Sequence, residues 1–442
     1  MVRQVADART PGWKAVLAVS VAGAALLWHV LACTESPMAF SPSGKDLAFV
    51  VMTPYDLKDL HLLGGHTYRL MVARQGKKAR IVEQTDRHML TAPAFSPDGK
   101  CLAYLRIPLM TKEDADKLGE KTAQRAKLLE EKLVYPLGGR PADTQPADEA
   151  GETKDLALPA IQRVAEFYKN ALSTPLVPVE LVVRDAMATE VVMATVTIEL
   201  PVLATSMQDS SGGLVYTYLL TRPQYSPDGQ WIHFCLGSIA AAVNPKTAAK
   251  RLLAAPATVS VLSPDGKTLA TAYDRDITFV RTDGSRKAAI RWEGDLSASG
   301  IVWADNKTLA LLVPDDKQAE IRFLQTDGNV IRTFAVPKPQ RKSEQSSGEL
   351  ALAPDRKHIV IAYGKEVHFL DAAGGLLNRW QGERAELSQP TFTPDGKRVA
   401  FRRLREGGVQ EIVYFSPDGH EIPDAKVALP KLAPPAEDAA TR

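Results

Sequence analysis

The stretch Ala94-Phe95-Ser96-Pro97-Asp98-Gly99-Lys100-Cys101-Leu102-Ala103-Tyr104 decides the fold of this chain. Pro97 sets the backbone angle φ that the second position of a type I turn needs, and Asp98 tolerates the third position. Gly99 takes the left-handed conformation that would strain a residue with a Cβ atom. The apolar residues on both sides favour β-strands. The stretch therefore predicts a strand, a tight turn with a glycine bulge, and a second strand.

Copies of this unit recur to the end of the sequence, and the late ones are evenly spaced. They are Phe40-Ser41-Pro42-Ser43-Gly44, Tyr225-Ser226-Pro227-Asp228-Gly229, Leu262-Ser263-Pro264-Asp265-Gly266 and Phe392-Thr393-Pro394-Asp395-Gly396, with degraded copies at Trp303-Ala304-Asp305-Asn306 and Leu352-Ala353-Pro354-Asp355. The aligned positions 227, 264, 304, 354 and 394 are 37 to 50 residues apart. This is the period of a four-stranded propeller blade. A second turn in each late repeat, such as Thr282-Asp283-Gly284, indicates four strands per repeat.

The strands that follow the first turn are apolar on both faces, as expected for a strand that lies between two neighbouring sheets. Together, Phe95 to Lys100 with its apolar strand and the segment Asp276 to Gly284 resemble the WD-like repeats of TolB-type β-propellers. The resemblance covers most of residues 36–428 and implies an all-β fold. We predict a seven-bladed β-propeller, with six or eight blades as the alternatives. Such a fold says little about activity.

The composition excludes some classes of protein. The chain has 442 residues, 45% of them hydrophobic, and a formal charge of +2. No nucleic-acid motif is present, so nucleic-acid binding is not expected. Three cysteines, Cys33, Cys101 and Cys235, are too few for a disulfide framework. We expect Cys101 and Cys235 to be buried free thiols, with a disulfide between them as the alternative.

Residues 1–35 are predicted to be a cytoplasmic tail followed by a signal anchor or signal peptide. From Trp13 to Cys33 the only charge is Lys14, and the length suits one bilayer crossing. Basic residues before the span favour a cytoplasmic N-terminus and an exported, periplasmic propeller on a single-pass anchor. Two alternatives stay open. Val30-Leu31-Ala32-Cys33 resembles a lipobox, which would make Cys33 the lipid-bearing residue of a lipoprotein. A simple cleaved signal peptide would give a secreted protein.

The second repeat is interrupted, because 130 residues separate Pro97 from Pro227. Residues 109–174 are predicted to be a helical, partly flexible insertion in blade two. Its two helices carry apolar stripes that need a cover, and these are candidate partner-binding residues: Leu118, Leu129, Ile161, Val164 and Tyr168. Packing within the chain is the alternative use of these stripes. Residues 429–442 are predicted to be a disordered tail.

Chain direction predicts which side of the ring faces the membrane. About four residues separate the apolar span from the first innermost strand, and at about 3.3 Å each they reach roughly 13 Å. The face that carries the connections between blades should therefore look toward the membrane, and the Ser-Pro-Asp-Gly turns should look away. The insertion should emerge on this same face. So should a set of basic residues expected near anionic headgroups, namely Lys338, Arg341, Lys342, Arg402, Arg403 and Arg405.

The sequence contains no recognisable catalytic set and no metal or cofactor motif. His61 and His66, near Asp56 and Asp59, lack ligand spacing, and His233 and His358 are expected to be core histidines. We therefore predict a non-enzymatic, membrane-tethered propeller that serves as a scaffold or recognition platform for a protein partner in the cell envelope. The alternative is a secreted glycan- or peptide-processing hydrolase or lyase with its site in the central channel. Convergent His, Arg, Glu and Tyr side chains in the channel would favour that enzyme.

Overall fold

The computed structural model describes residues 38–54, 66–74, 77–108, 176–188, 191–201, 207–208, 214–215, 223–236, 239–254, 257, 259–273, 276–283, 286–291, 300–313, 319–337, 339, 348–405 and 410–428. The predicted membrane helix, the helical insertion and the C-terminal tail lie outside these residues. Within them, no helix has the length and apolar character needed to cross a membrane.

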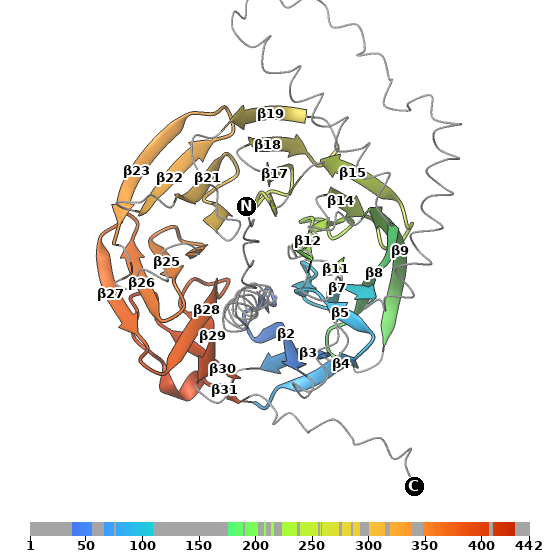
Figure 1. Cartoon of the computed structure of the whole chain (residues 1–442), viewed down its shortest axis with the longest axis horizontal. Coiled ribbons are helices and arrows are strands. Elements are labelled where there is room, and N and C mark those ends of the chain that lie inside the picture. Colours follow the sequence, from blue (N-terminus) through green and yellow to red (C-terminus); the bar gives the residue numbers. More distant parts are fainter. Residues whose placement is uncertain are drawn as a thin grey trace, which may run out of the picture.

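Seven antiparallel sheets are arranged around a central opening (Figure 1). Six of them have four strands in sequence order, and the sheet of blade 2 has five. The prediction of an all-β, seven-bladed propeller is therefore confirmed. The strands of each sheet follow one another in sequence order from the centre of the ring to its rim, and neighbouring strands pair antiparallel (Figure 1).

The strands of each blade follow the order of the sequence. Blade 1 consists of β1 (Ala39–Phe40), β2 (Asp46–Pro54), β3 (His66–Arg74) and β4 (Arg80–Thr85). Blade 2 consists of β5 (His88–Leu90), β6 (Ala94–Phe95), β7 (Cys101–Pro108), β8 (Leu176–Asp185) and β9 (Val192–Pro201). Blade 3 consists of β12 (Gln224–Tyr225), β13 (Ile232–Leu236), β14 (Ile239–Val243) and β15 (Lys250–Ala254). Blade 4 consists of β16 (Val259–Leu262), β17 (Thr268–Tyr273), β18 (Asp276–Arg281) and β19 (Arg286–Arg291).

The remaining blades repeat this order. Blade 5 consists of β20 (Ile301–Trp303), β21 (Thr308–Val313), β22 (Ala319–Gln325) and β23 (Val330–Val336). Blade 6 consists of β24 (Glu349–Leu352), β25 (His358–Ala362), β26 (Glu366–Asp371) and β27 (Leu376–Gln381). Blade 7 consists of β28 (Ala385–Phe392), β29 (Val399–Arg405), β30 (Gln410–Phe415) and β31 (Val427–Ala428), with the short 3-10 helix η4 (Pro423–Ala425) before β31.

Blade 2 shows where the interruption of the repeat falls. β7 and β8 pair directly, with Cys101 opposite Asp185 and Arg106 opposite Glu180. Residues 109–175 therefore separate the second and third main strands of the blade. The extra strands β10 (Met207–Gln208) and β11 (Leu214–Val215) form a separate two-stranded sheet and not an eighth blade.

The core consists of apolar clusters in the seams between blades. Between blades 6 and 7, Phe369, Phe401 and Phe415 contact one another with ring centroids 5.3 to 6.0 Å apart. The seam between blades 7 and 1 closes the ring, and there Phe40 lies 6.3 Å from Tyr414 between ring centroids. Each large side chain buried in this way stabilises the fold by roughly 1.5–3 kcal/mol. Both faces of the inner strands of each blade therefore pack against the neighbouring blades.

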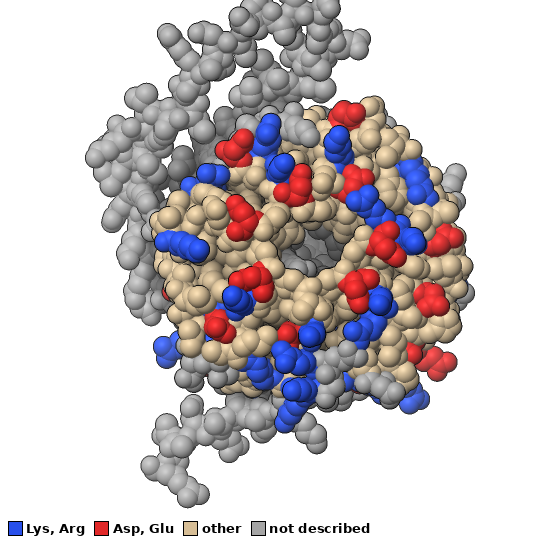
Figure 2. All heavy atoms as spheres, turned by 180° about the vertical axis from the view of Figure 1, so that it is seen from behind, with Lys and Arg blue, Asp and Glu red and all other residues tan. Residues whose placement is uncertain are grey.

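The Ser-Pro-Asp-Gly turns have the conformation that their sequence predicts. Gly99 has a φ of +72°, and the Ser96 hydroxyl donates to Asp98 at 2.6 Å while accepting the Cys101 N–H at 2.9 Å. In the degraded turn of blade 6, Arg356 occupies the glycine position with a φ of +61°. We call the face with these turns the turn side and the opposite face the inter-blade side. Figure 2 shows one face of the ring, with charges of both signs around the central opening.

Candidate functional site

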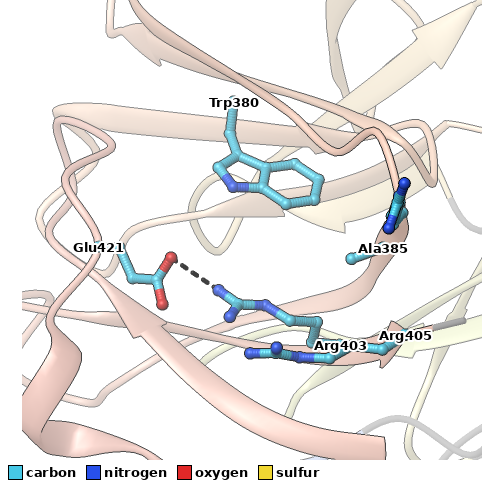
Figure 3. A pocket seen from close by; sticks show the side chains of 6 residues that line it. Trp380, Ala385, Arg403, Arg405 and Glu421 are labelled. Carbon is cyan, nitrogen blue, oxygen red and sulfur yellow. Dashed lines mark ion pairs between the residues drawn. The ribbon is translucent and has the colours of Figure 1, made fainter. Parts of the chain in front are cut away.

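A recess of about 490 Å³ lies at the outer end of the seam between blades 6 and 7. Figure 3 shows Trp380 on one side of it and Arg403 and Arg405 on the other, with Ala385 between them. Its six lining residues come from two blades: Trp380, Arg384, Ala385, Arg403, Arg405 and Glu421. The lining therefore combines one large aromatic ring, three arginines and one carboxylate.

Chain direction brings Trp380, Arg384, Ala385, Arg403 and Arg405 to the inter-blade side. Trp380 is next to the last residue of β27, and Ala385 is the first residue of β28. The connection between them is tight, because a Cβ on Gly382 would overlap the ring of Trp380 and the carbonyl oxygen of Ala385. Arg403 and Arg405 lie at the end of β29, which runs toward the same side.

Arg403 is buried at the floor of the recess, with 6% of its surface exposed. It follows Val399 and Phe401 on the face of β29 that packs against blade 6, because side chains alternate along a strand. Its Nη1 lies 3.2 Å from Glu411 and its Nη2 lies 2.7 Å from Glu421. Within the described part of the chain, its Nε has no hydrogen-bond acceptor. A buried guanidinium with an unused donor is costly, because nothing replaces the water it has lost.

Arg405 forms the open side of the recess. Its side chain is 47% exposed, and its Nε and Nη2 lie 2.7 and 2.6 Å from Glu411. Arg384 is also exposed. A carboxylate or phosphate oxygen that entered the recess would meet planar guanidinium donors, which bind such groups in a bidentate manner. Trp and Arg are also the side chains that contribute most to protein interfaces.

The basic residues predicted for the inter-blade side have different surroundings. Arg403 and Arg405 line the recess, whereas Arg402 lies on the opposite face of β29, is buried, and donates from Nη2 to Gln410 at 2.5 Å. Of the three, Arg405 alone is strongly exposed. A role for them at anionic headgroups stays a prediction.

The other predicted site residues lie outside the described residues: Cys33, Leu118, Leu129, Ile161, Val164, Tyr168, Lys338, Arg341 and Lys342. Trp380, Arg384 and Glu421 of the recess were not predicted. Trp380 and Arg384 belong to an outermost strand and to a connection between blades, where the repeat carries no recurring residue.

Burial disfavours the charged form of two histidines in the core, His233 and His368. Burial lowers the pKa of His233 to about 4, and this side chain lies in the core as predicted. His358 was also expected in the core, but it is only half-buried and lies 3.6 Å from Asp355. Burial also lowers the pKa of His368, whose Nε2 lies 2.6 Å from Glu366. Among the described side chains, no group of three or more His, Cys, Asp or Glu is arranged to hold a metal ion.

The cysteines inside the ring are both free thiols, so the disulfide alternative is wrong. Cys235 is buried as predicted, and its thiol donates to the carbonyl oxygen of Ala257 at 3.1 Å. Cys101 is only half-buried, which corrects the prediction, because its side chain lies near the turn side beneath the exposed Met193.

Comparison with known proteins shows no matching family model and no matching curated protein. The chain is similar to many solved structures, among them the following three. Dihydro-heme d1 dehydrogenase NirN, in complex with DHE, is 14% identical with a TM-score of 0.47, and the match covers 89% of this chain and 66% of that one. The C-terminal WD40 domain of Sif2 is 11% identical with a TM-score of 0.45, covering 87% and 82%. A chain of the mitotic checkpoint complex is 16% identical with a TM-score of 0.40, covering 57% and 74%. The shared feature is the fold.

Proposed function

We propose that this chain is an exported, TolB-like propeller, held at the cytoplasmic membrane by residues 13–33, that binds a protein partner in the cell envelope without acting on it chemically. The observation that carries the proposal is the recess between blades 6 and 7. A single aromatic ring beside three arginines is the composition of an interface anchor.

The recess favours a partner that inserts one carboxylate. Glu411 and Glu421 neutralise Arg403 and Arg405 in part, and Arg384 is a third guanidinium in the lining. An entering carboxylate would supply an acceptor for the buried Arg403 and would be partly desolvated by Trp380. Desolvated, hydrogen-bonded charge pairs of this kind give strong interface contacts.

The residues of three innermost strands favour a protein-binding platform over the alternative, a hydrolase or lyase. Three of the strands that border the central opening are almost entirely apolar, namely β16 (Val259–Leu262), β20 (Ile301–Trp303) and β6 (Ala94–Phe95). Two others, β24 and β28, carry Glu349 and Glu386. A channel enzyme needs several polar side chains that converge on one point. The three apolar strands contribute only Ser260.

The proposal is tested by photo-crosslinking in intact membranes. A photoreactive amino acid at Arg384 in the full-length chain should capture one protein, which mass spectrometry identifies. Trp380→Ala and Arg405→Ala should each reduce the capture about tenfold or more, whereas Lys307→Ala, on the turn side of blade 5, should leave it unchanged. Deletion of residues 109–174 then asks whether the insertion contributes to the contact. Equal capture by all recess variants would contradict the proposal.

A further inference from the structure

The turn side of blade 2 carries a cluster of exposed apolar side chains between β8 and β9. Met187 and Val191 are 50% exposed, Val192 is 44% exposed and Met193 is 60% exposed. Single exposed apolar residues are common on protein surfaces, whereas a contiguous group usually marks a binding surface. We call these four residues the apolar patch.

The backbone around the patch holds these side chains outward. The Asp185 carboxylate accepts the N–H groups of Met187 and Ala188 at 2.6 and 2.8 Å, and these hydrogen bonds lower its pKa. The pairing of β8 with β9 also shifts register between Val183 and Arg184. The start of β9 is therefore irregular, and Met193 contacts the thiol of Cys101 at 3.4 Å while most of its surface remains exposed.

Cations of blade 1 frame one side of the patch. Arg74 lies 3.9 Å from the sulfur of Met187, measured from its Nη2, and Arg80 donates to the carbonyl oxygen of Ala186. Lys77 and Lys78 follow in the same turn and are exposed. Asp46 pairs with Arg74 at 2.8 Å, and the carboxylate of Asp185 acts on Arg80, so the exposed Lys77 and Lys78 carry the uncompensated positive charge of this border.

Cations of blade 3 frame the other side. Lys250 reaches back across the seam and donates from Nζ to the carbonyl oxygen of Thr197 in β9 at 2.6 Å. Lys246 is exposed in the preceding turn, which Asn244 braces by accepting the Lys246 N–H at 3.0 Å. Arg251 stacks on Trp231 with 3.9 Å between its Cζ and the ring centroid. The cations of blade 3 thus border β9, the strand that carries part of the patch, on the side opposite to blade 1.

We propose that the apolar patch and its two cationic borders form a second docking surface, for a protein segment in which apolar side chains are flanked on both sides by carboxylates. Burial of the patch supplies the favourable free energy of removing apolar surface from water. The bordering lysines attract the flanking carboxylates and so fix where the segment binds. The surface lies on the turn side, so it is separate from the recess and does not depend on it. An envelope scaffold with two such faces can hold two proteins at once.

The test uses a fluorescent peptide whose layout mirrors the surface, Glu-Glu-Leu-Leu-Glu-Glu, which extends over about 20 Å. Anisotropy measures its binding to the full-length chain in nanodiscs of zwitterionic lipid. Two matched peptides, one with Gln in place of Glu and one with Gly in place of Leu, should bind at least about tenfold more weakly, because each lacks one component of the contact. Binding should weaken as salt rises from low to physiological ionic strength.

Variants test whether peptide binding depends on this surface and not on other parts of the ring. Lys77→Glu with Lys78→Glu, and Lys246→Glu with Lys250→Glu, should each weaken binding about tenfold, and Met193→Ser should weaken it further. Lys307→Glu with Lys357→Glu, exposed lysines in the turns of blades 5 and 6, should change it little. Equal binding of all three peptides would overturn the proposal. So would phosphatidylglycerol vesicles that bind through the same lysines while the peptide does not, because the ligand would then be a lipid surface.

Discussion

The pyrrolidine ring of Pro227 in the blade 3 turn fills the space beside Gly266 in the blade 4 turn, so that a Cβ on Gly266 would overlap it. The relationship recurs between other neighbouring turns. A Cβ on Gly99 would lie 3.3 Å from Pro42, and one on Gly44 would lie 3.4 Å from Pro394. The last contact joins blade 7 to blade 1. The proline and glycine of the repeat thus shape each turn and also pack one turn against the next.

Gly266→Ala should therefore destabilise the ring more than the same substitution at a glycine with similar backbone strain but no neighbouring atoms. Gly364 provides that control, because its φ is +76° and nothing lies within 4 Å of an added Cβ. Gly364→Ala should cost about 1 kcal/mol, from backbone strain alone. Gly266→Ala should cost about 3 kcal/mol, because the overlap with Pro227 is added to the same strain. Chemical denaturation measures both, and equal costs would show that the contact between turns is unimportant.

Stability should fall in acid because the turn aspartates are held in their charged form. The Ser96 hydroxyl and then the Lys100 N–H bind the carboxylate of Asp98 and lower its pKa. Hydrogen bonds from Ser226 and Thr393 act in the same way on Asp228 and Asp395. A lowered pKa in the folded state contributes stability above the unfolded value of about 3.9, and this contribution is lost as the pH falls through the folded value.

Denaturation midpoints measured between pH 6 and pH 2 should therefore decline below about pH 4. Ser96→Ala should raise the pKa of Asp98 toward its ordinary value, as followed by NMR titration of the carboxylate. The triple variant Asp98→Asn, Asp228→Asn and Asp395→Asn should show a shallower decline. If the denaturation midpoint of the triple variant declines as steeply as that of the unchanged chain, groups other than these three aspartates cause the acid sensitivity.

Arg403 and Arg405 should differ sharply when each is truncated. Arg403→Ala removes a buried side chain and leaves the partly exposed Glu421 with Lys426 as its remaining cation, so it should cost about 2 kcal/mol. Arg405→Ala removes a half-exposed side chain and should cost less than about 1 kcal/mol. Urea denaturation of the two variants makes the comparison, and a cost for Arg403 as small as that for Arg405 would mean that the floor of the recess is open to water.

The seam that closes the ring should be sensitive to alkali. Burial raises the pKa of Tyr414 in this seam to about 12, and it raises that of Tyr68 in the next seam, between blades 1 and 2, also to about 12. A raised pKa means that stability is complete below the unfolded value of about 10 and is lost as the pH rises toward 12. Tyr414→Phe keeps the ring beside Phe40 and should make the loss of stability between pH 10 and 12 less steep. An unchanged slope would show that Tyr414 ionises without cost in the folded chain.

Turn chemistry made most of the fold predictable. Ser96-Pro97-Asp98-Gly99 favours one local conformation wherever it stands, because proline fixes φ and glycine accepts the left-handed region. Its recurrence predicted the position of the interruption in blade 2, and the second turn of each late repeat predicted four strands per repeat. The site was predictable only in part. Arg403 and Arg405 were placed on the correct side by chain direction, but the burial of Arg402 and Arg403 was not predicted.

The sequence by itself determined a ring of four-stranded sheets with a turn side and an inter-blade side, because these follow from interactions between residues close together in the chain. The tertiary structure alone decided which distant residues meet: Trp380 with Arg403, and Arg74 with Met187, which is 113 positions further along the chain. Such contacts depend on how two blades pack across a seam. A single sequence does not record that packing, because many apolar pairs of similar volume fill a seam equally well.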